Sequence, residues 1–311
     1  MPAHTDTLLR YRPWRGGLHG PLWAAAAMAR VSLRLMFRRW QLWGLFALGL
    51  LVFSFFFYAQ YLVVWITTQL TTETVRFAGI PVTVGDLTKF LNRLSLNGTD
   101  HTFGNFIWFQ GYVLVIVLAL AGSVLVGNDF FHGSLPFYLS KPIGRWHYVL
   151  GKCLAIGAFV NLMTTLPALC LYVQYGLLSS YDYFTASGHL LGGILAHGVI
   201  LSSFLALLLV ATAVAVRRTV PLIMTWTTLF FFFRRLAEAL VDRLYYDPRW
   251  RLIDLWNDLY LVGLWCLRVD PGTIRPQPMP GFGEAALVVA GVCAASLLYL
   301  RKRVQAVEVV L

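Results

Sequence analysis

The chain has 311 residues, of which 58% are hydrophobic and only 13% are charged, and its formal net charge is +11. An ordinary soluble domain carries roughly a quarter charged residues, so this composition excludes a typical soluble fold and indicates a membrane protein. The excess of positive charge does not indicate nucleic-acid binding, because the basic residues flank apolar runs, as at Arg30–Arg39 and Arg301–Arg303.

The segment Pro21–Trp40 has the pattern of a basic amphipathic helix. Arg30, Arg34 and Arg38 recur at four-residue intervals, and apolar residues such as Leu33 occupy another side. Such a helix is expected to lie in the inner membrane interface, with its apolar face in lipid and its arginines among the headgroups. We expect no cleavable signal peptide in the first 40 residues, because an apolar core followed by a small-residue cleavage site is missing there.

About six apolar runs follow, each close to the roughly 20 residues needed to cross a bilayer. The expected spans are Trp43–Ile66, Trp108–Val126, Leu154–Leu177, Leu190–Val216, Val220–Phe233 and Ala285–Leu300. The fifth of these is short. The predicted fold is therefore an all-α polytopic membrane protein, with residues 1–311 forming a single transmembrane domain.

The distribution of basic residues predicts the topology. Cytoplasmic segments of membrane proteins are enriched in Lys and Arg, and residues 1–41 contain seven arginines. An even number of spans returns the tail with Arg301–Arg303 to the same side, together with the loops 127–152 and Arg217–Arg218. The loop Ser179–Gly188 has no Lys or Arg, as expected outside. We expect both termini to be cytoplasmic and the protein to lie in a plasma membrane, such as a bacterial inner membrane.

Two long segments are expected on the outer side. Residues 67–107 are rich in Thr and Asn and should form a small cap. Residues 234–283 contain seven arginines that six acidic residues nearly balance. Within this second segment, Leu255–Leu267 is apolar but too short to span a bilayer. We interpret it as a re-entrant or interfacial helix before the last span.

The expected spans carry essentially no Asp, Glu, Lys or Arg between their ends. An enzyme or a proton-coupled carrier normally retains such groups inside its spans. His189 and His197 are eight residues apart and could share a helix face, but a haem would usually require a matching pair on a second helix. We therefore interpret His197 as a hydrogen-bonded helix residue and predict neither a metal site nor a catalytic site.

Two further patterns are missing from the sequence. The four cysteines are widely scattered without a Cys-x-x-Cys pair, which argues against a disulfide framework or a thiolate metal site. No Gly-x-x-x-x-Gly-Lys-Ser/Thr phosphate loop occurs: Gly151-Lys152 is followed by Cys153, and no glycine stands five residues before Gly151. We expect no ATPase activity in the chain itself, so that any ATP-driven work requires a partner.

The most informative segment is Gly127–Lys152, GNDFFHGSLPFYLSKPIGRWHYVLGK, between the second and third spans. Gly133-Ser134 can end the preceding helix, and Pro142 breaks the chain again because it lacks a backbone donor and fixes its own φ. The residues between these breaks are mostly apolar. Such a short element at the cytoplasmic face suits docking to another protein, although an ordinary tight loop packed on its own bundle has the same pattern.

This segment resembles the first cytoplasmic loop of ABC-2 type transporter permeases. The family pairs an acidic residue with a Gly-Ser-Leu element, a Leu-x-x-Pro-x-x-Arg element and a Gly-Lys that opens the next helix. The matching residues are Asp129, Gly133-Ser134-Leu135, Leu139 with Pro142 and Arg145, and Gly151-Lys152. Six spans, a basic helix before the first and a re-entrant segment before the last also resemble the family. Many members have two acids where Asn128 and Asp129 stand, and the first outer loop is longer here than in minimal members.

The resemblance implies a permease subunit of an exporter, in which two such subunits form the path and two separate ATPase subunits bind below. ATP and the catalytic residues would then belong to the ATPase, with no cofactor in this chain. The implied ATPase-coupling residues are Asn128, Asp129, Gly133, Ser134, Leu135, Phe137, Tyr138, Leu139, Lys141, Pro142, Arg145, Gly151 and Lys152. The other implied partners are membrane lipids and a second permease subunit, identical or not, and no nucleic acid is expected.

Two other classes remain open from the sequence. A secondary carrier or channel should show intramembrane charge or repeated discontinuous helices, and no such charge is evident in the expected spans. A non-transporting anchor or assembly subunit would need only its bundle, with His197 as a haem ligand in one version. An ATPase that accompanies the chain through purification would favour the permease.

Overall fold

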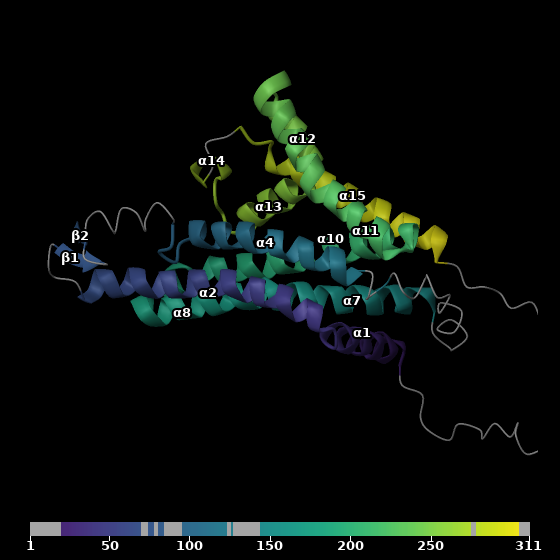
Figure 1. The fold of residues 1–311 in the computed structure, drawn as a ribbon, viewed down its shortest axis with the longest axis horizontal. Helices are drawn as coiled ribbons and strands as arrows, with labels where there is room; N and C mark the ends of the chain where they lie inside the picture. Colours follow the sequence, from purple (N-terminus) through teal and green to yellow (C-terminus); the bar gives the residue numbers. More distant parts are fainter. Residues whose placement is uncertain are drawn as a thin grey trace, which may run out of the picture.

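The computed structural model describes residues 20–69, 74–77, 80–83, 95–122, 126, 144–274 and 278–304. In this part of the chain the architecture is a bundle of long helices with one small hairpin (Figure 1). Five helical segments within it are long and apolar enough to cross a membrane. They are Leu42–Ile66, Asp100–Gly122, Arg145–Ser179, Gly188–Val216 and Phe282–Arg303. The chain is thus a helical protein with several candidate membrane spans.

The first two helices are joined by a sharp break. Helix α1 covers Pro21–Phe37 and begins with proline in its first turn, a position where the missing backbone donor costs nothing. Helix α2 covers Trp40–Gln69, and the indole of Trp43 closes the break by donating a 2.8 Å hydrogen bond to the Phe37 carbonyl. At about 1.5 Å per residue, α2 is long enough to cross a bilayer.

The centre of the bundle consists of α4 (Asp100–Gly122), α7 (Arg145–Met163), α8 (Thr165–Ser179) and α10 (Gly188–Val216). The short helix α9 (Asp182–Ala186) connects α8 to α10. Helix α10 ends at Arg217, which has φ +56°, a left-handed C-terminal residue of a common type.

The break between α7 and α8 has a local cause. Pro167 has no N–H, so the Met163 carbonyl four residues earlier loses its helical donor. The side chain of Gln110 in α4 supplies one instead, with its Nε2 2.6 Å from that carbonyl oxygen. The two helices therefore form one bent segment that is fastened to α4 at the bend.

The next segment is helical over a long distance but irregular. Helix α11 (Thr219–Thr227) continues through the short π-helix η2 (Thr228–Phe232), α12 (Phe233–Ala239) and the short π-helix η3 (Leu240–Tyr245). Figure 1 shows this segment leaving the bundle at an angle. It stops at Tyr246, whose φ of +55° turns the chain back.

The returning chain forms the 3-10 helix η4 (Pro248–Ile253), then α13 (Leu255–Cys266), α14 (Pro271–Ile274) and α15 (Phe282–Arg303). Helix α13 contacts α4, α10 and α15. Nine consecutive residues of α13, from Trp256 to Leu264, are buried. A helix of only 12 residues is thus enclosed by long ones.

Five of the six expected spans match the candidate membrane spans with several corrected boundaries, whereas the short fifth, Val220–Phe233, is not among the candidates in the described part of the chain. The second begins at Asp100 rather than at Trp108, and the third begins at Arg145 rather than at Leu154. The fifth continues past Phe233, so Arg234–Tyr245 is helical although we assigned it to the outer segment. The reason is that Arg234 pairs with Glu238 one turn later, and such pairs support a helix.

The segment that we expected to form the first outer loop contains a short β-hairpin in an otherwise helical structure. Strands β1 (Thr74–Phe77) and β2 (Ile80–Thr83) pair antiparallel, with Thr74 opposite Thr83. Thr and Val are well suited to strands. The hairpin lies at the end of the bundle opposite to α1 (Figure 1).

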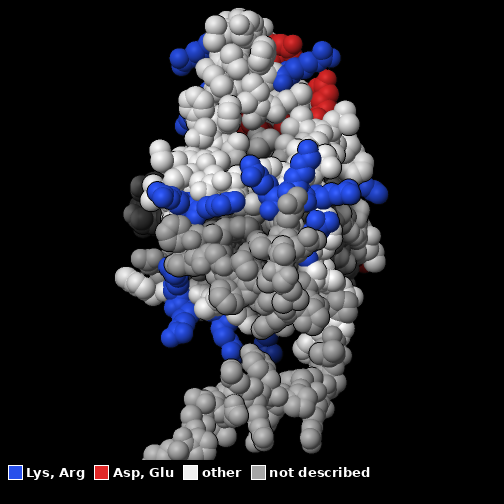
Figure 2. Space-filling view, turned by 90° about the vertical axis from the view of Figure 1, so that its right-hand side faces the viewer, with Lys and Arg blue, Asp and Glu red and all other residues white. Residues whose placement is uncertain are grey.

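The start of α7, the α10–α11 junction and the end of α15 lie together at the other end of the bundle, on the right in Figure 1. Figure 2 shows this end with many Lys and Arg side chains, while the Asp and Glu side chains in view lie mainly toward the top. The helix ends that flank residues 123–143 therefore belong to a basic end of the molecule.

The Gln110 bond allows a test by double-mutant cycle. We expect Gln110→Met to lower the thermal unfolding temperature in detergent more in the wild type than in a Pro167→Ala background. The alanine at 167 provides an N–H for the Met163 carbonyl, so the expected coupling is about 1 kcal/mol. Equal effects of Gln110→Met in both backgrounds would show that this carbonyl does not depend on Gln110.

Candidate functional site

The predicted coupling residues fall into two groups. Ten of them lie outside the described residues: Asn128, Asp129, Gly133, Ser134, Leu135, Phe137, Tyr138, Leu139, Lys141 and Pro142. The other three, Arg145, Gly151 and Lys152, lie on α7.

The first turns of α7 are covered by α1. Arg145 is exposed at the first position of the helix. A Cβ atom on Gly151 would lie 3.0 Å from the Ala25 carbonyl oxygen, so the two helix backbones nearly touch there. Lys152 is only 6% exposed, and its Nζ lies 3.3 Å from Ser32 Oγ. Because of these contacts, we expect α1 and the start of α7 to move together.

The burial of Lys152 corrects one expectation. We assigned this lysine to polar contacts with an ATPase or with lipid headgroups. The structure places it under α1, where its ammonium group also lies 5.7 Å from the centre of the Tyr148 ring. Its aliphatic stem is covered by α1, so Lys152 joins α7 to α1 and does not form part of an exposed docking surface.

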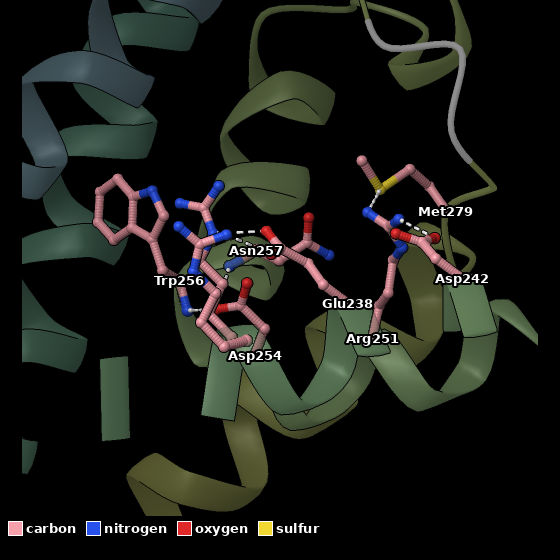
Figure 3. A network of polar contacts seen from close by, with 9 residues as sticks. Glu238, Asp242, Arg251, Asp254, Trp256, Asn257 and Met279 are labelled. Atoms are coloured by element: carbon pink, nitrogen blue, oxygen red, sulfur yellow. Dashed lines mark hydrogen bonds and ion pairs between the residues drawn. The ribbon is translucent and has the colours of Figure 1, made fainter. Parts of the chain in front are cut away.

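A second site lies where α12, η4 and α13 meet (Figure 3). Asp254 caps α13 by accepting hydrogen bonds from the backbone N–H groups of Trp256 and Asn257, at 3.1 and 3.2 Å. Aspartate is a preferred residue at this position because its oxygen satisfies donors that have no partner inside the helix. The cap fixes the start of α13 inside the bundle.

The Trp256 ring lies directly on Gly111 of α4. A Cβ atom at position 111 would overlap the indole, so a glycine is required for this close approach. At the other end of α13, a Cβ atom on Gly193 of α10 would lie 2.5 Å from the Cys266 carbonyl oxygen. Each end of α13 thus packs directly against a glycine backbone, of Gly111 in α4 at one end and of Gly193 in α10 at the other.

The positive charge of Arg234 on α12 acts on Asp254 in this site. Its guanidinium carbon lies 4.9 Å from the ring centres of both Trp108 and Tyr112, a cation–π geometry. The same group donates a 2.9 Å hydrogen bond to Glu238 Oε1, and Arg235 donates to the other oxygen at 3.0 Å. Arg234 is therefore engaged by two aromatic rings of α4 and by one carboxylate.

Two buried carboxyl groups share the site with this arginine. Burial raises the pKa of Asp254 to about 6, although its cap hydrogen bonds and the charge of Arg234 oppose the rise. Burial raises the pKa of Asp258 to about 9, and the neighbouring charge of Asp254 adds to the increase. Asp258 is fully buried. Neither of its carboxyl oxygens has a hydrogen-bond partner among the described residues.

Two ion pairs hold η4 in place at this site. Arg251 of η4 is 6% exposed and lies 3.3 Å from Asp242 of η3, with the Met279 sulfur 3.8 Å away. Arg249 reaches Glu284 at the start of α15, at 3.2 Å. These pairs, the first of them visible in Figure 3, hold η4 against both the protruding helix and the last span.

His197 occupies the opposite side of α13. It is buried in α10 and forms a hydrogen bond with the backbone of Leu259, while its ring lies against Gly263. His189 is exposed, so the two histidines do not share a buried site. Among the described residues, no group of three or more His, Cys, Asp or Glu side chains is placed to hold a metal ion.

No protein-family model matches this chain, and no curated protein matches it either.

Sequence reasoning did not identify the carboxyl groups of α13 as a candidate site. We counted Asp254 and Asp258 only among the acids that balance the arginines of residues 234–283. A signal was present in the sequence, because Asn257-Asp258 interrupts the otherwise apolar run Leu255–Leu267. Polar residues inside such a run are costly, and they commonly mark a functional position.

The contact between Gly111 and Trp256 can be tested by adding one methyl group. We expect Gly111→Ala to destabilise the protein by about 1–3 kcal/mol, because the new Cβ atom forces the indole away from α4. The measurement is thermal unfolding in detergent. Gly192→Ala is the matched control, since a Cβ atom there meets nothing within 4 Å. Equal unfolding temperatures for the two variants would contradict the close contact.

Proposed function

We propose that this chain is the membrane-spanning permease subunit of an ATP-binding cassette exporter, driven by a separate ATPase that docks on residues 127–152. The observation that carries this proposal is the sequence pattern of residues 127–152 together with its position between α4 and α7. The acidic, Gly-Ser-Leu and Leu-x-x-Pro-x-x-Arg elements follow α4 and lead into α7. Both helix ends lie at the basic end of the bundle, which the positive-inside rule assigns to the cytoplasm.

The packing of α7 supports a route for mechanical coupling. A force on residues 127–143 would reach Arg145 and the first turns of α7. Because Gly151 and Lys152 contact α1, α1 would move together with α7. Gln110 joins α4 to the bend of the same helix. ATP-driven closure of the ATPase pair would thus shift α1, α4 and α7 together, and transport would follow from different substrate affinities in the two conformations.

A secondary carrier is the second candidate, because the structure buries ionisable groups that the expected spans do not contain. Asp254 and Asp258 are both within the bundle, with Arg234 beside them. The energy source distinguishes the candidates: the permease requires ATP and an ATPase, whereas a carrier works from an ion gradient in vesicles that contain only this chain.

The first test is purification in mild detergent. We expect an ATPase with a phosphate loop to accompany the wild type, as identified by mass spectrometry. Leu139→Asp places a charge in the proposed apolar anchor and should reduce ATPase recovery at least roughly tenfold, which corresponds to about 1.4 kcal/mol. Asp129→Ala should abolish ATP-dependent transport while the chain stays in the membrane.

Tyr181→Asp is the matched control, because it adds the same charge at an 80% exposed position before α9, away from the proposed docking loop. It should leave ATPase recovery unchanged. Normal recovery and transport with both loop variants, or the absence of any ATP-hydrolysing companion of the wild type, would overturn the proposal.

A further inference from the structure

Asp258 is a carboxyl group whose surroundings do not suit a negative charge. Its side chain is 0% exposed, and neither oxygen has a hydrogen-bond partner in the described parts of the chain. An ionised carboxylate in such a place loses its hydration without receiving any compensation. The cost is large unless the charge is paired or removed by protonation.

The cations on the neighbouring elements are already engaged. On α12, Arg234 binds Glu238 and lies against the rings of Trp108 and Tyr112, and its charge also acts on Asp254. On η4, Arg251 pairs with Asp242.

The remaining elements around α13 do not supply a counter-charge either. Arg249 of η4 pairs with Glu284 of α15, and His197 of α10 is bonded to the backbone of Leu259. Helix α4 has no Lys or Arg, and neither does η2. Among the described residues, the charged group that acts on Asp258 is Asp254, and a like charge disfavours ionisation further.

We propose that Asp258 is a proton-binding site inside the bundle, occupied at neutral pH in the conformation described here. Protonation removes the charge without requiring any partner to move, which fits a carboxyl group enclosed by α4, α10 and α15. The rise in the pKa of Asp258 to about 9 agrees with this assignment. The inference does not depend on whether ATP or an ion gradient drives transport.

The site provides a link between protonation and conformation. A rearrangement that admits water to the start of α13 would lower the pKa of Asp258 toward its ordinary value of 3.8 and release the proton. The enclosed conformation is therefore favoured at low pH and the hydrated one at high pH. A transport cycle that alternately opens and closes this region would take up and release one proton at Asp258.

The sign of the effect on stability follows from the same shift. Between about pH 4 and about pH 9 the folded protein holds a proton on Asp258 that the unfolded chain has lost. The contribution to stability is complete below the ordinary pKa and is lost as the pH rises toward 9. The unfolding temperature should fall across this range, and Asp258→Asn, which remains neutral, should lose this part of the decline.

Infrared difference spectroscopy of the purified full-length protein provides the direct test. At pH 7 we expect the carbonyl band of a protonated carboxylic acid, which disappears on titration above pH 9 and is missing in Asp258→Asn. Asp182→Asn is the matched control, since Asp182 is an exposed carboxyl group at the start of α9 and its loss should change neither the band nor the pH dependence of unfolding.

A second measurement needs no variant and so remains decisive if Asp258→Asn does not fold. An apolar carbodiimide adds to protonated, buried carboxyl groups, and peptide mass spectrometry should locate the adduct at Asp258, with labelling decreasing as the pH approaches 9. An unlabelled Asp258, or a carbonyl band that is unchanged in Asp258→Asn, would overturn the proposal. Stabilisation by sodium or potassium salts at constant pH, lost in Asp258→Asn, would identify a metal cation as the occupant and would also overturn it.

Discussion

The close approach of helix backbones at glycine is the constraint on which this structure depends most. Gly111 lets the Trp256 ring lie on α4, and Gly193 lets α10 touch the end of α13. Small residues serve this purpose in membrane bundles, where packing and hydrogen bonds replace the hydrophobic effect between helices. These two contacts help to enclose a helix of 12 residues among α4, α10 and α15.

Enclosure of α13 has an electrostatic consequence. The first backbone N–H groups of α13 need hydrogen-bond acceptors, and Asp254 provides one. The burial of α13 also removes Asp258 from contact with water. Arg234, which lies against the rings of Trp108 and Tyr112, offsets part of the negative charge of Asp254. Because Asp258 has no hydrogen-bond partner among the described residues, the site is sensitive to protons, and it lies beside the irregular segment formed by η2, α12 and η3.

At the basic end of the bundle, α1 packs closely against the start of α7. The apolar face of α1 covers Gly151 and Lys152, while Leu22 and Trp23 remain exposed on its other side, as suits a helix at a membrane surface. A movement of α7 is thereby coupled both to the membrane interface through α1 and to the interior through Gln110. This arrangement agrees with the proposal that α7 transmits force from an ATPase docked on residues 127–152.

The sequence by itself determined the membrane class, the approximate helices and the short apolar helix before the last span, because these follow from the length and composition of apolar runs. Only the tertiary structure decided that Lys152 is buried under α1 and that Asp258 is enclosed with no hydrogen-bond partner in the described part of the chain. Burial of a side chain depends on which helices pack together. The glycine contacts that determine this packing, such as that between Gly111 and Trp256, join residues that are far apart in the sequence. The hairpin formed by β1 and β2 was likewise missed, because two strands of four residues are too short for a reliable pattern.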